Sequence, residues 1–266
     1  MSKTILITGS TDGLGLETAK ALVTEGHRVV IHGRSQEKIA RALSELAPSA
    51  AAGVHGVCAD LSSLQIIPAF VAGLRDVVPE LDVLINNAGL YKVGEPILPS
   101  GLDVRFVVNT IAPYALVKQL TPLFVPGARV VNLSSAAQAP LDMEAFRGHR
   151  RLDDGSAYAQ SKLALTAWTH MLSQSPAASD PLFIAVNPGS FLATKMVREA
   201  YGSSGRDISQ GVDILLRAAL SEEFATAGGK YFDNDSGRFA DPHPAALDVA
   251  KGQALIDEMD GILGGD

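Results

Sequence analysis

Short apolar runs recur along the chain, and segments with helical periodicity separate them. Runs this apolar are typical of parallel strands buried on both faces, and the intervening segments are long enough for crossover helices. The runs lie at residues 4–7, 28–31, 54–57, 83–85, 129–133 and 183–186, with a further one at 230–232. We therefore expect an α/β fold: a doubly wound parallel sheet of about seven strands with helices on both faces.

No Pro-, Gly- or Ser-rich linker, internal repeat or second apolar core divides the chain, so residues 1–266 are expected to form one domain. Residues 190–225 are expected to form a substrate loop region within it. The polar stretch at 141–155 interrupts the alternation of apolar runs and helical segments, and we interpret it as a surface excursion. Its arginines leave an anionic-substrate clamp as the alternative, formed by Arg147, Arg150 and Arg151.

Composition narrows the class of partner. Hydrophobic residues make up 47% of the chain and charged residues 19%, which is typical of a soluble globule. The formal net charge of -7 and the lack of a Lys/Arg tract argue against a nucleic-acid surface. No apolar run has the length of a membrane span, no signal-peptide pattern is present and Cys58 is the only cysteine, so we expect a cytoplasmic protein. The scattered histidines predict no metal site.

A glycine-rich turn follows the first apolar run. Its glycines permit a tight turn and a close approach of backbone to a phosphate, and the helix expected near Gly13 offers unpaired N–H groups and the positive end of its dipole. Asp12 is of the residue type that caps a helix N-terminus. The turn predicts a pyrophosphate seat formed by Gly9, Ser10, Thr11, Asp12, Gly13, Leu14 and Gly15.

Tyr158 and Lys162 lie one helical turn apart, so a helix places both side chains on one face. A free tyrosine has a pKa near 10, and a nearby ammonium lowers that pKa because it stabilises the phenolate. A phenol tuned in this way can exchange a proton with a substrate oxygen at neutral pH. Together with the glycine turn, the pair suggests nicotinamide-dependent carbonyl chemistry.

Over nearly its whole length the chain resembles the short-chain dehydrogenase/reductase family, whose motifs occur here in order. They are residues 8–15, Asp60-Leu61, Asn86-Asn87-Ala88-Gly89, Asn109, Ser134-Ser135, residues 158–162 and Asn187-Pro188-Gly189. The resemblance implies a Rossmann fold in which Tyr158 protonates the carbonyl oxygen and Ser135 orients it. It also implies that Lys162 bonds the nicotinamide ribose and that Asn109 holds a relay water. For Asn109, a buried amide that only satisfies backbone groups is the alternative.

The same resemblance implies the remaining cofactor contacts. Asp60 and Leu61 are expected at the adenine, and Thr194 is expected near the nicotinamide amide. Thr194 stands one position later than the family's usual threonine, so Ser190 or loop backbone is the alternative for that contact. The other expected cofactor-lining residues are Asn87, Ala88, Gly89, Pro188 and Gly189.

The end of the second strand predicts which dinucleotide binds. A carboxylate there would accept hydrogen bonds from both ribose hydroxyls of NAD, whereas a guanidinium would pair with the 2'-phosphate of NADP. Arg34 and Ser35 favour NADP(H). Asp12 opposes this, because phosphate-preferring relatives often carry a basic residue at its position, but an N-cap role explains Asp12. We expect NADP(H), with NAD(H) as the alternative.

Substrate contacts are expected from loops that follow strand ends. Their side chains are mostly apolar, so we expect a ketone or aldehyde on a hydrophobic or aromatic frame. The long segment between Ser135 and Tyr158 resembles retinol-dehydrogenase-like and protochlorophyllide-reductase-like members of the family, and a final helical segment at 245–259 resembles the former. The expected substrate-facing side chains are Tyr91, Phe191, Met196 and Tyr201.

Two other functions fit parts of the pattern. A non-catalytic NADP(H)-binding sensor would use the same fold, but it has no use for the Tyr158 and Lys162 pair. A sugar-nucleotide epimerase would need a larger C-terminal domain than the residues after position 230 provide. The resemblance also implies pairing through the helices after the fourth and fifth strands, so a homodimer or homotetramer is expected.

Overall fold

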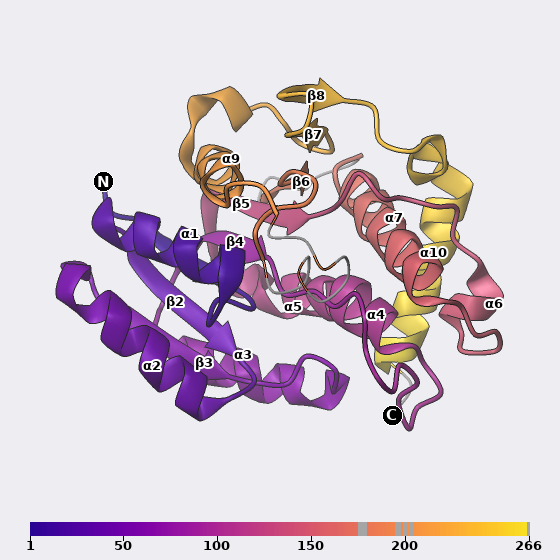
Figure 1. Cartoon of the computed structure of the whole chain (residues 1–266), viewed down its shortest axis with the longest axis horizontal. Coiled ribbons are helices and arrows are strands. Elements are labelled where there is room, and N and C mark those ends of the chain that lie inside the picture. The colour runs from indigo at the N-terminus through magenta and orange to yellow at the C-terminus, as the bar shows by residue number, and fades with distance from the viewer. Residues whose placement is uncertain (175–179, 195–197, 199–201, 203–204, 265–266) are drawn as a thin grey trace.

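The computed structural model describes residues 1–174, 180–194, 198, 202 and 205–264, and its strands form one sheet (Figure 1). The strand order is β3-β2-β1-β4-β5-β6-β7-β8, with the first seven strands parallel and β8 antiparallel to β7. The strands are β1 (Thr4–Ile7), β2 (Arg28–Gly33), β3 (Val54–Cys58), β4 (Leu81–Asn86), β5 (Phe124–Leu133), β6 (Leu182–Asn187), β7 (Tyr231–Asp233) and β8 (Arg238–Ala240). The predicted doubly wound α/β fold is confirmed, and β8 is the addition.

Helices cover both faces of this sheet. On one face lie α1 (Gly13–Thr24), α2 (Gln36–Leu46) and α9 (Ser209–Leu220). On the other face lie α3 (Ile67–Arg75), α4 (Val104–Phe106), the π-helix η3 (Val107–Ile111), α5 (Ala112–Leu120), α6 (Met143–Phe146), α7 (Asp154–Leu172) and α10 (Val249–Gly264). Short 3-10 turns are η1 (Ala47–Ser49), η2 (Leu64–Ile66), η4 (Thr121–Leu123), η5 (Glu222–Phe224) and η6 (Pro244–Leu247).

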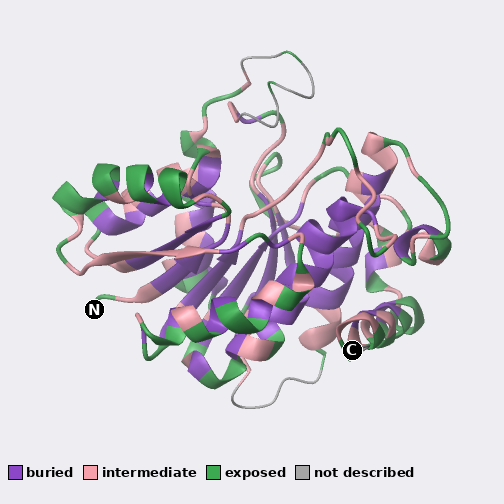
Figure 2. Cartoon of the chain, turned by 90° about the horizontal axis from the view of Figure 1, so that it is seen from below, coloured by how far each residue is buried: buried purple, intermediate pink, exposed green. Residues whose placement is uncertain are grey.

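The central strands are largely apolar because both of their faces are covered. Alternate side chains point to opposite faces, so Ile5 and Ile7 pack toward α1, α2 and α9, while Leu6 packs toward α3, α5 and α7. Figure 2 shows the buried strands enclosed between layers whose outer faces are exposed. This arrangement leaves the carboxyl ends of the strands as the edge where a ligand site can form.

Residues 141–155 are not only a surface excursion, so that interpretation is wrong in part. Phe146 of α6 is completely buried, and its ring meets that of Phe106 edge to face at 5.1 Å between centroids. Arg147 pairs with Glu144 and Glu258. None of the segment's three arginines, all of which the structure describes, lines the cavity presented below. The anionic-substrate clamp therefore has no support in the structure.

In the part of the chain that the structure describes, every helix is too short or too polar to cross a membrane. The described His, Cys, Asp and Glu side chains likewise form no group of three that is placed to hold a metal ion.

Candidate active site

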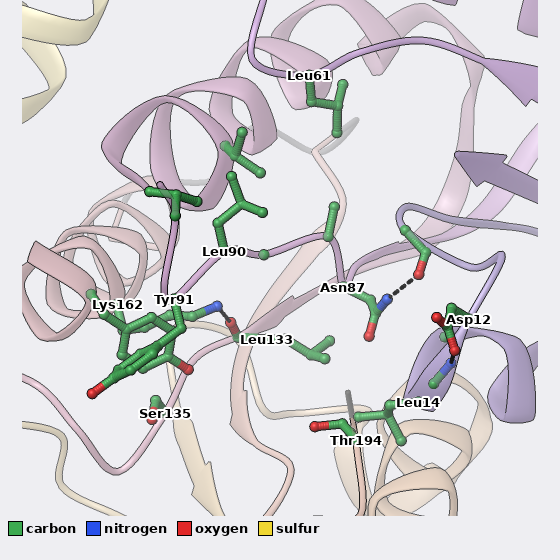
Figure 3. A pocket seen from close by; sticks show the side chains of 18 of the residues that line it. Asp12, Leu14, Leu61, Asn87, Leu90, Tyr91, Leu133, Ser135, Lys162 and Thr194 are labelled. Carbon is green, nitrogen blue, oxygen red and sulfur yellow. Dashed lines mark hydrogen bonds between the residues drawn. The ribbon is translucent and has the colours of Figure 1, made fainter. Parts of the chain in front are cut away.

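A cavity of about 790 Å³ opens at the carboxyl ends of the parallel strands (Figure 3). Asp12 and Leu14 mark one end of it, Lys162 and Ser135 mark the other, and Asn87 lies between them. The predicted site residues that line it are Gly9, Thr11, Asp12, Gly13, Leu14, Gly15, Arg34, Asp60, Leu61, Asn87, Ala88, Gly89, Tyr91, Ser135, Tyr158, Lys162, Pro188, Gly189, Phe191 and Thr194. The predictions Met196 and Tyr201 lie outside the described residues.

Three predicted residues do not line the cavity. Ser10 is completely buried, and its hydroxyl donates to Ile7 O (2.7 Å) and accepts from the N–H of His32 (3.0 Å). Ser35 caps α2, because its hydroxyl accepts a hydrogen bond from the N–H of Lys38. Asn109 is also buried. The side chains of Ser10 and Asn109 are thus committed to the protein's own hydrogen bonds, whereas the Ser35 hydroxyl accepts one hydrogen bond as a helix cap.

The glycine turn offers an anion seat. Asp12 is the N-cap of α1, and its carboxylate accepts a hydrogen bond from the N–H of Gly13 at 2.7 Å, as the N-cap interpretation predicted. Gly13 has φ 54, and a Cβ built on it would have no atom within 4 Å. The helix N-terminus therefore faces open space, where its dipole favours a phosphate. The pyrophosphate of a dinucleotide fits this geometry.

Asn87 holds the glycine turn to the sheet. Its side-chain amide donates to Thr8 O (2.8 Å) and Gly9 O (2.9 Å), and the Thr8 hydroxyl accepts from the N–H groups of Asn87 and Ala88. A Cβ on Gly15 would lie 2.5 Å from the Asn87 amide nitrogen, so only glycine fits there. This glycine serves packing against Asn87, whereas the sequence suggested only the approach to phosphate. Thr8 is a supporting residue that the sequence did not single out.

His32 is the second support that sequence reasoning missed. Its Nδ1 accepts a hydrogen bond from the N–H of Gly9 (3.0 Å), and its Nε2 lies 3.0 Å from Ala59 O. These partners fit a neutral ring that carries its proton on Nε2. Burial lowers the pKa of His32 to about 4, so the ring stays neutral at physiological pH. Its place at the end of β2, beside the turn, was the available signal.

Two cations stand at the end of the cavity that adjoins β2 and α2. Arg34 follows β2 and is exposed, and Lys38 in the first turns of α2 lines the same wall. Asp60 faces this end too, and its carboxylate accepts from the N–H and the hydroxyl of Ser62. The region thus presents two unburied positive side chains beside a carboxylate that is already hydrogen-bonded. Lys38 was not predicted, although it lies only four residues after Arg34, in the first turn of α2.

Tyr158 and Lys162 meet at the other end of the cavity, on α7. The Lys162 ammonium is buried, donates to Leu133 O at 2.6 Å and lies 5.7 Å from the centroid of the Tyr158 ring. Burial lowers the pKa of Lys162 to about 8. At neutral pH most Lys162 side chains therefore remain charged, and the ammonium can stabilise a phenolate at Tyr158. The Tyr91 ring packs edge to face on Tyr158, with 4.9 Å between centroids.

Asn109 stands behind this pair, in the π-helix η3. Its side chain forms a reciprocal pair with the backbone of Leu90, at 2.8 and 2.9 Å, and also donates to the Ser161 hydroxyl at 2.9 Å. These are the contacts that the backbone-satisfying alternative expects. π-Helical turns are frequent at functional sites because they reposition side chains and carbonyls within a helix. Asn109 thus fixes the loop after β4 against α7.

Ser135 follows β5, and its main chain is held from two sides. Its carbonyl accepts hydrogen bonds from the Gln138 amide (2.9 Å) and the Tyr231 hydroxyl (3.2 Å), and its own hydroxyl accepts from the N–H of Ala137 (3.1 Å). The hydroxyl hydrogen remains available for a donor role toward the cavity. Ser134 and Ser135 both line the cavity, but the Ser134 hydroxyl is engaged with that of Thr166, so Ser135 is the serine placed to donate to a ligand.

The loop after β6 is tied to the turn between β7 and β8. Asp235 accepts hydrogen bonds from the N–H (2.9 Å) and hydroxyl (2.5 Å) of Ser190 and from the Asn187 amide (2.9 Å). The Ser190 hydroxyl is therefore already engaged, which weakens it as a substitute for Thr194. Thr194 lines the cavity, and its N–H donates to Leu192 O. Phe191 also lines the cavity, with half of its surface exposed.

Comparison with known proteins agrees with this geometry. The family model described as short chain dehydrogenase matches residues 3–203. Retinol dehydrogenase 12 of Mus musculus is 31% identical over 87% of this chain and 78% of its own length. Polyprenol dehydrogenase of Homo sapiens is 31% identical over 86% of this chain and 76% of its own length. The crystal structure of an uncharacterized protein from Mycobacterium Paratuberculosis superposes with a TM-score of 0.77 at 26% identity, covering 98% of this chain and 92% of that one.

Proposed function

Because this chain belongs to the short chain dehydrogenase family, we propose that it is an NADP(H)-dependent oxidoreductase that interconverts a carbonyl group and an alcohol on a small hydrophobic or aromatic substrate. Its place among the dehydrogenases and reductases of this family makes it an enzyme of nicotinamide-dependent CH–OH and C=O chemistry. The observation that carries the proposal is the convergence of Ser135, Tyr158 and Lys162 on one cavity that also contains the glycine turn.

Each side chain has a distinct task in this reaction. The bound dinucleotide supplies the hydride. The Tyr158 phenol gives its proton to the carbonyl oxygen, and the Lys162 ammonium stabilises the phenolate that remains. The Ser135 hydroxyl donates a hydrogen bond to the same oxygen and so fixes its direction. In the reverse direction the Tyr158 phenolate takes the proton from the alcohol.

The dinucleotide preference rests on the end of the cavity that adjoins β2 and α2. Arg34 presents a guanidinium that can pair with a 2'-phosphate through two parallel hydrogen bonds, and Lys38 adds a second positive charge to the same wall. Asp12, which opposed this choice, is engaged as the N-cap of α1. The proposal is therefore NADP(H) over NAD(H).

The substrate class rests on the wall near Tyr158. Leu90, Tyr91, Val93 and Phe191 give this part of the cavity an apolar and aromatic lining. Two similar proteins are named for the alcohols retinol and polyprenol, which are hydrophobic molecules. We infer the same class of substrate, an aldehyde or ketone on an apolar frame, without a commitment to either compound.

A panel of carbonyl compounds tests the reaction. Apolar aliphatic and aromatic aldehydes and ketones, each paired with a hydroxylated compound of similar size, are mixed with enzyme and NADPH, and NADPH oxidation is followed. We expect kcat/KM to be about a hundredfold higher for apolar members, since a polar group without a partner in the cavity costs about 3 kcal/mol. Absence of NADPH oxidation across the panel, or preference for the hydroxylated members, would contradict the proposal.

Calorimetric titration with NADPH and NADH tests the dinucleotide preference. Wild type should bind NADPH at least tenfold more tightly, and Arg34→Ala should remove most of that difference by weakening NADPH binding alone. Arg41→Ala is the matched control, because Arg41 is an exposed arginine of α2 that does not line the cavity. Tighter NADH binding by the wild type would reverse the assignment.

A further inference from the structure

Arg105 is a completely buried arginine that lies outside the site described above. Its guanidinium binds both oxygens of Asp103, with Nε 2.9 Å from Oδ1 and Nη2 2.6 Å from Oδ2. Nη1 donates to Asp154 Oδ1. Asp103 is also buried, whereas the Asp154 side chain is 40% exposed. A buried ion pair contributes little net stability because desolvation offsets the attraction. A gain in stability therefore does not explain why this cluster is present.

The cluster joins α4 to α7, the helix that carries both Tyr158 and Lys162. Arg105 belongs to α4, which continues directly into η3, and Asp154 is the first residue of α7. Farther along the same two helices, the side chains of Asn109 and Thr110 bind the hydroxyl and the carbonyl of Ser161, each at 2.9 Å. The turn of α7 that carries Tyr158 therefore lies between two attachments to α4 and η3, and Arg105 makes the first of them.

The cluster also places charge near Tyr158. Asp154, Tyr158 and Lys162 follow one another at intervals of one helical turn, so Asp154 and Tyr158 stand on the same face of α7, with Cβ atoms about 6 Å apart by helix geometry. A carboxylate there disfavours a phenolate, and Lys162 on the far side favours it. With Arg105 shared between two carboxylates, the cluster has a net charge of one negative unit.

Other ionisable groups pack on the phenol, line the same cavity or belong to the start of α7. From the loop after β4 these are Tyr91, Lys92 and Glu95, and from α7 and its N-cap they are Lys162 and Asp153. None of them changes in the variants proposed below, so differences between those variants report the cluster alone.

We propose that Arg105 is a positioning residue for the reaction, which holds the first turn of α7 in place and offsets the charge of Asp154 so that Lys162 dominates the field at Tyr158. This role rests on the proposed function of Tyr158 as the proton donor. Arg105 touches neither the cavity nor the reacting atoms and acts through α7.

The test is a series of variants that change the charge of the cluster, and the measured quantity is the pKa of Tyr158. The variants are Arg105→Gln, Asp154→Asn and Arg105→Gln/Asp154→Asn, and each is made with and without Tyr158→Phe. The difference in phenolate ultraviolet absorbance within each pair gives the pKa of Tyr158 without any turnover. The expected charges of the cluster relative to wild type are one unit more negative for Arg105→Gln, one unit more positive for Asp154→Asn and unchanged for the double variant.

The expected order of the Tyr158 pKa follows those charges. Arg105→Gln should raise it by about one unit, Asp154→Asn should lower it by up to about one unit, and the double variant should return it close to wild type. The pH profile of carbonyl turnover should shift in the same order, and Arg105→Lys, which keeps the charge, should keep the wild-type pKa. A helix anchor without an electrostatic role would lower kcat in both single variants and leave the pKa unmoved.

Shifts of the same sign in the two single variants, or no shift in either, would overturn the proposal. If Arg105→Gln does not fold, Asp154→Asn decides alone, because Asp154 itself is partly exposed and its loss leaves Arg105 bound to Asp103. An unmoved pKa in Asp154→Asn would then refute the role. Failure of the wild type to oxidise NADPH with any carbonyl would refute the proposed function instead, and the absorbance titration would still decide the role of Arg105.

Discussion

The two ends of the cavity are built from different forces. At the cofactor half, formed by the glycine turn, Asn87 and His32, neutral hydrogen bonds hold main-chain groups in place. At the chemical half, formed by Ser135, Tyr158, Lys162 and the elements behind them, buried charges add to such hydrogen bonds, because the Lys162 ammonium binds Leu133 O and Arg105 binds Asp103. Hydrogen bonds between neutral groups shape a binding surface at little cost in stability. Desolvated charges lower the stability of the fold, but they tune the groups that transfer protons. We therefore expect changes in the first half to act on binding and stability, and changes in the second to act on turnover.

The largest effect is expected from removal of the buried Lys162 ammonium, which should lower turnover without lowering the free energy of unfolding. In Lys162→Met, turnover should fall about a thousandfold, because the phenol loses the charge that supports its ionisation. The free energy of unfolding at pH 7 should not fall, since burial already disfavours the charged lysine, as its pKa of about 8 indicates. That penalty applies below pH 8 and is relieved as pH rises from 8 toward 10.5, so wild type should gain stability relative to the variant in this window.

Denaturant unfolding beside carbonyl turnover measures both effects. Lys251→Met is the control, because Lys251 is an exposed lysine of α10 and its loss should change neither quantity. A large loss of stability in Lys162→Met with normal turnover would reverse the assignment of this residue to the chemical half.

His32, in the cofactor half, should make the free energy of unfolding depend on pH. Its folded pKa of about 4 lies below the ordinary 6.5, so its stabilising contribution is present above pH 6.5 and is lost as pH falls toward 4. The loss amounts to about 3 kcal/mol over this window. His32→Gln does not titrate, so the difference in unfolding free energy between wild type and variant should shrink as the solution is acidified. The exposed His149→Gln should follow wild type, and parallel curves for His32→Gln would contradict the prediction.

A smaller effect is expected from the amide that holds the glycine turn. Asn87→Ala removes hydrogen bonds to Thr8 O and Gly9 O, so the Kd for the dinucleotide should rise about tenfold while kcat at saturation stays within a factor of about two. The neighbouring Asn86→Ala is a matched control, because the Asn86 amide binds Asn132 in the sheet and its loss should lower stability without a specific change in Kd. A fall in kcat larger than the rise in Kd would break the division between the two halves.

The sequence predicts the fold well because short-range pattern determines it. Strands buried on both faces must be apolar throughout, and each predicted run coincides with a strand. The antiparallel β8 was missed because Arg238–Ala240 is too short and too exposed to stand out as an apolar run. Phe146 was missed because one buried aromatic in a polar segment carries no periodicity.

Within the site, the sequence predicts the residues of the cavity wall better than the residues that support them. Gly13, Tyr158 and Lys162 belong to local motifs, so their spacing reveals them. His32 and Arg105 act through partners distant in the chain, such as Gly9 and Asp154, and no local spacing encodes those contacts. Ser10 and Asn109 match the family pattern, yet their side chains are spent on internal hydrogen bonds, which only the fold reveals.

Tyr158→Phe tests the central claim most directly, because it removes one oxygen from the chemical half and leaves the cofactor half untouched. NADPH affinity by calorimetry and carbonyl-dependent NADPH oxidation should be measured on the same preparations as wild type. We predict an NADPH Kd within about twofold of wild type and turnover reduced by a factor of about 10² to 10⁴. Turnover that survives the substitution would contradict the claim that the proton comes from Tyr158.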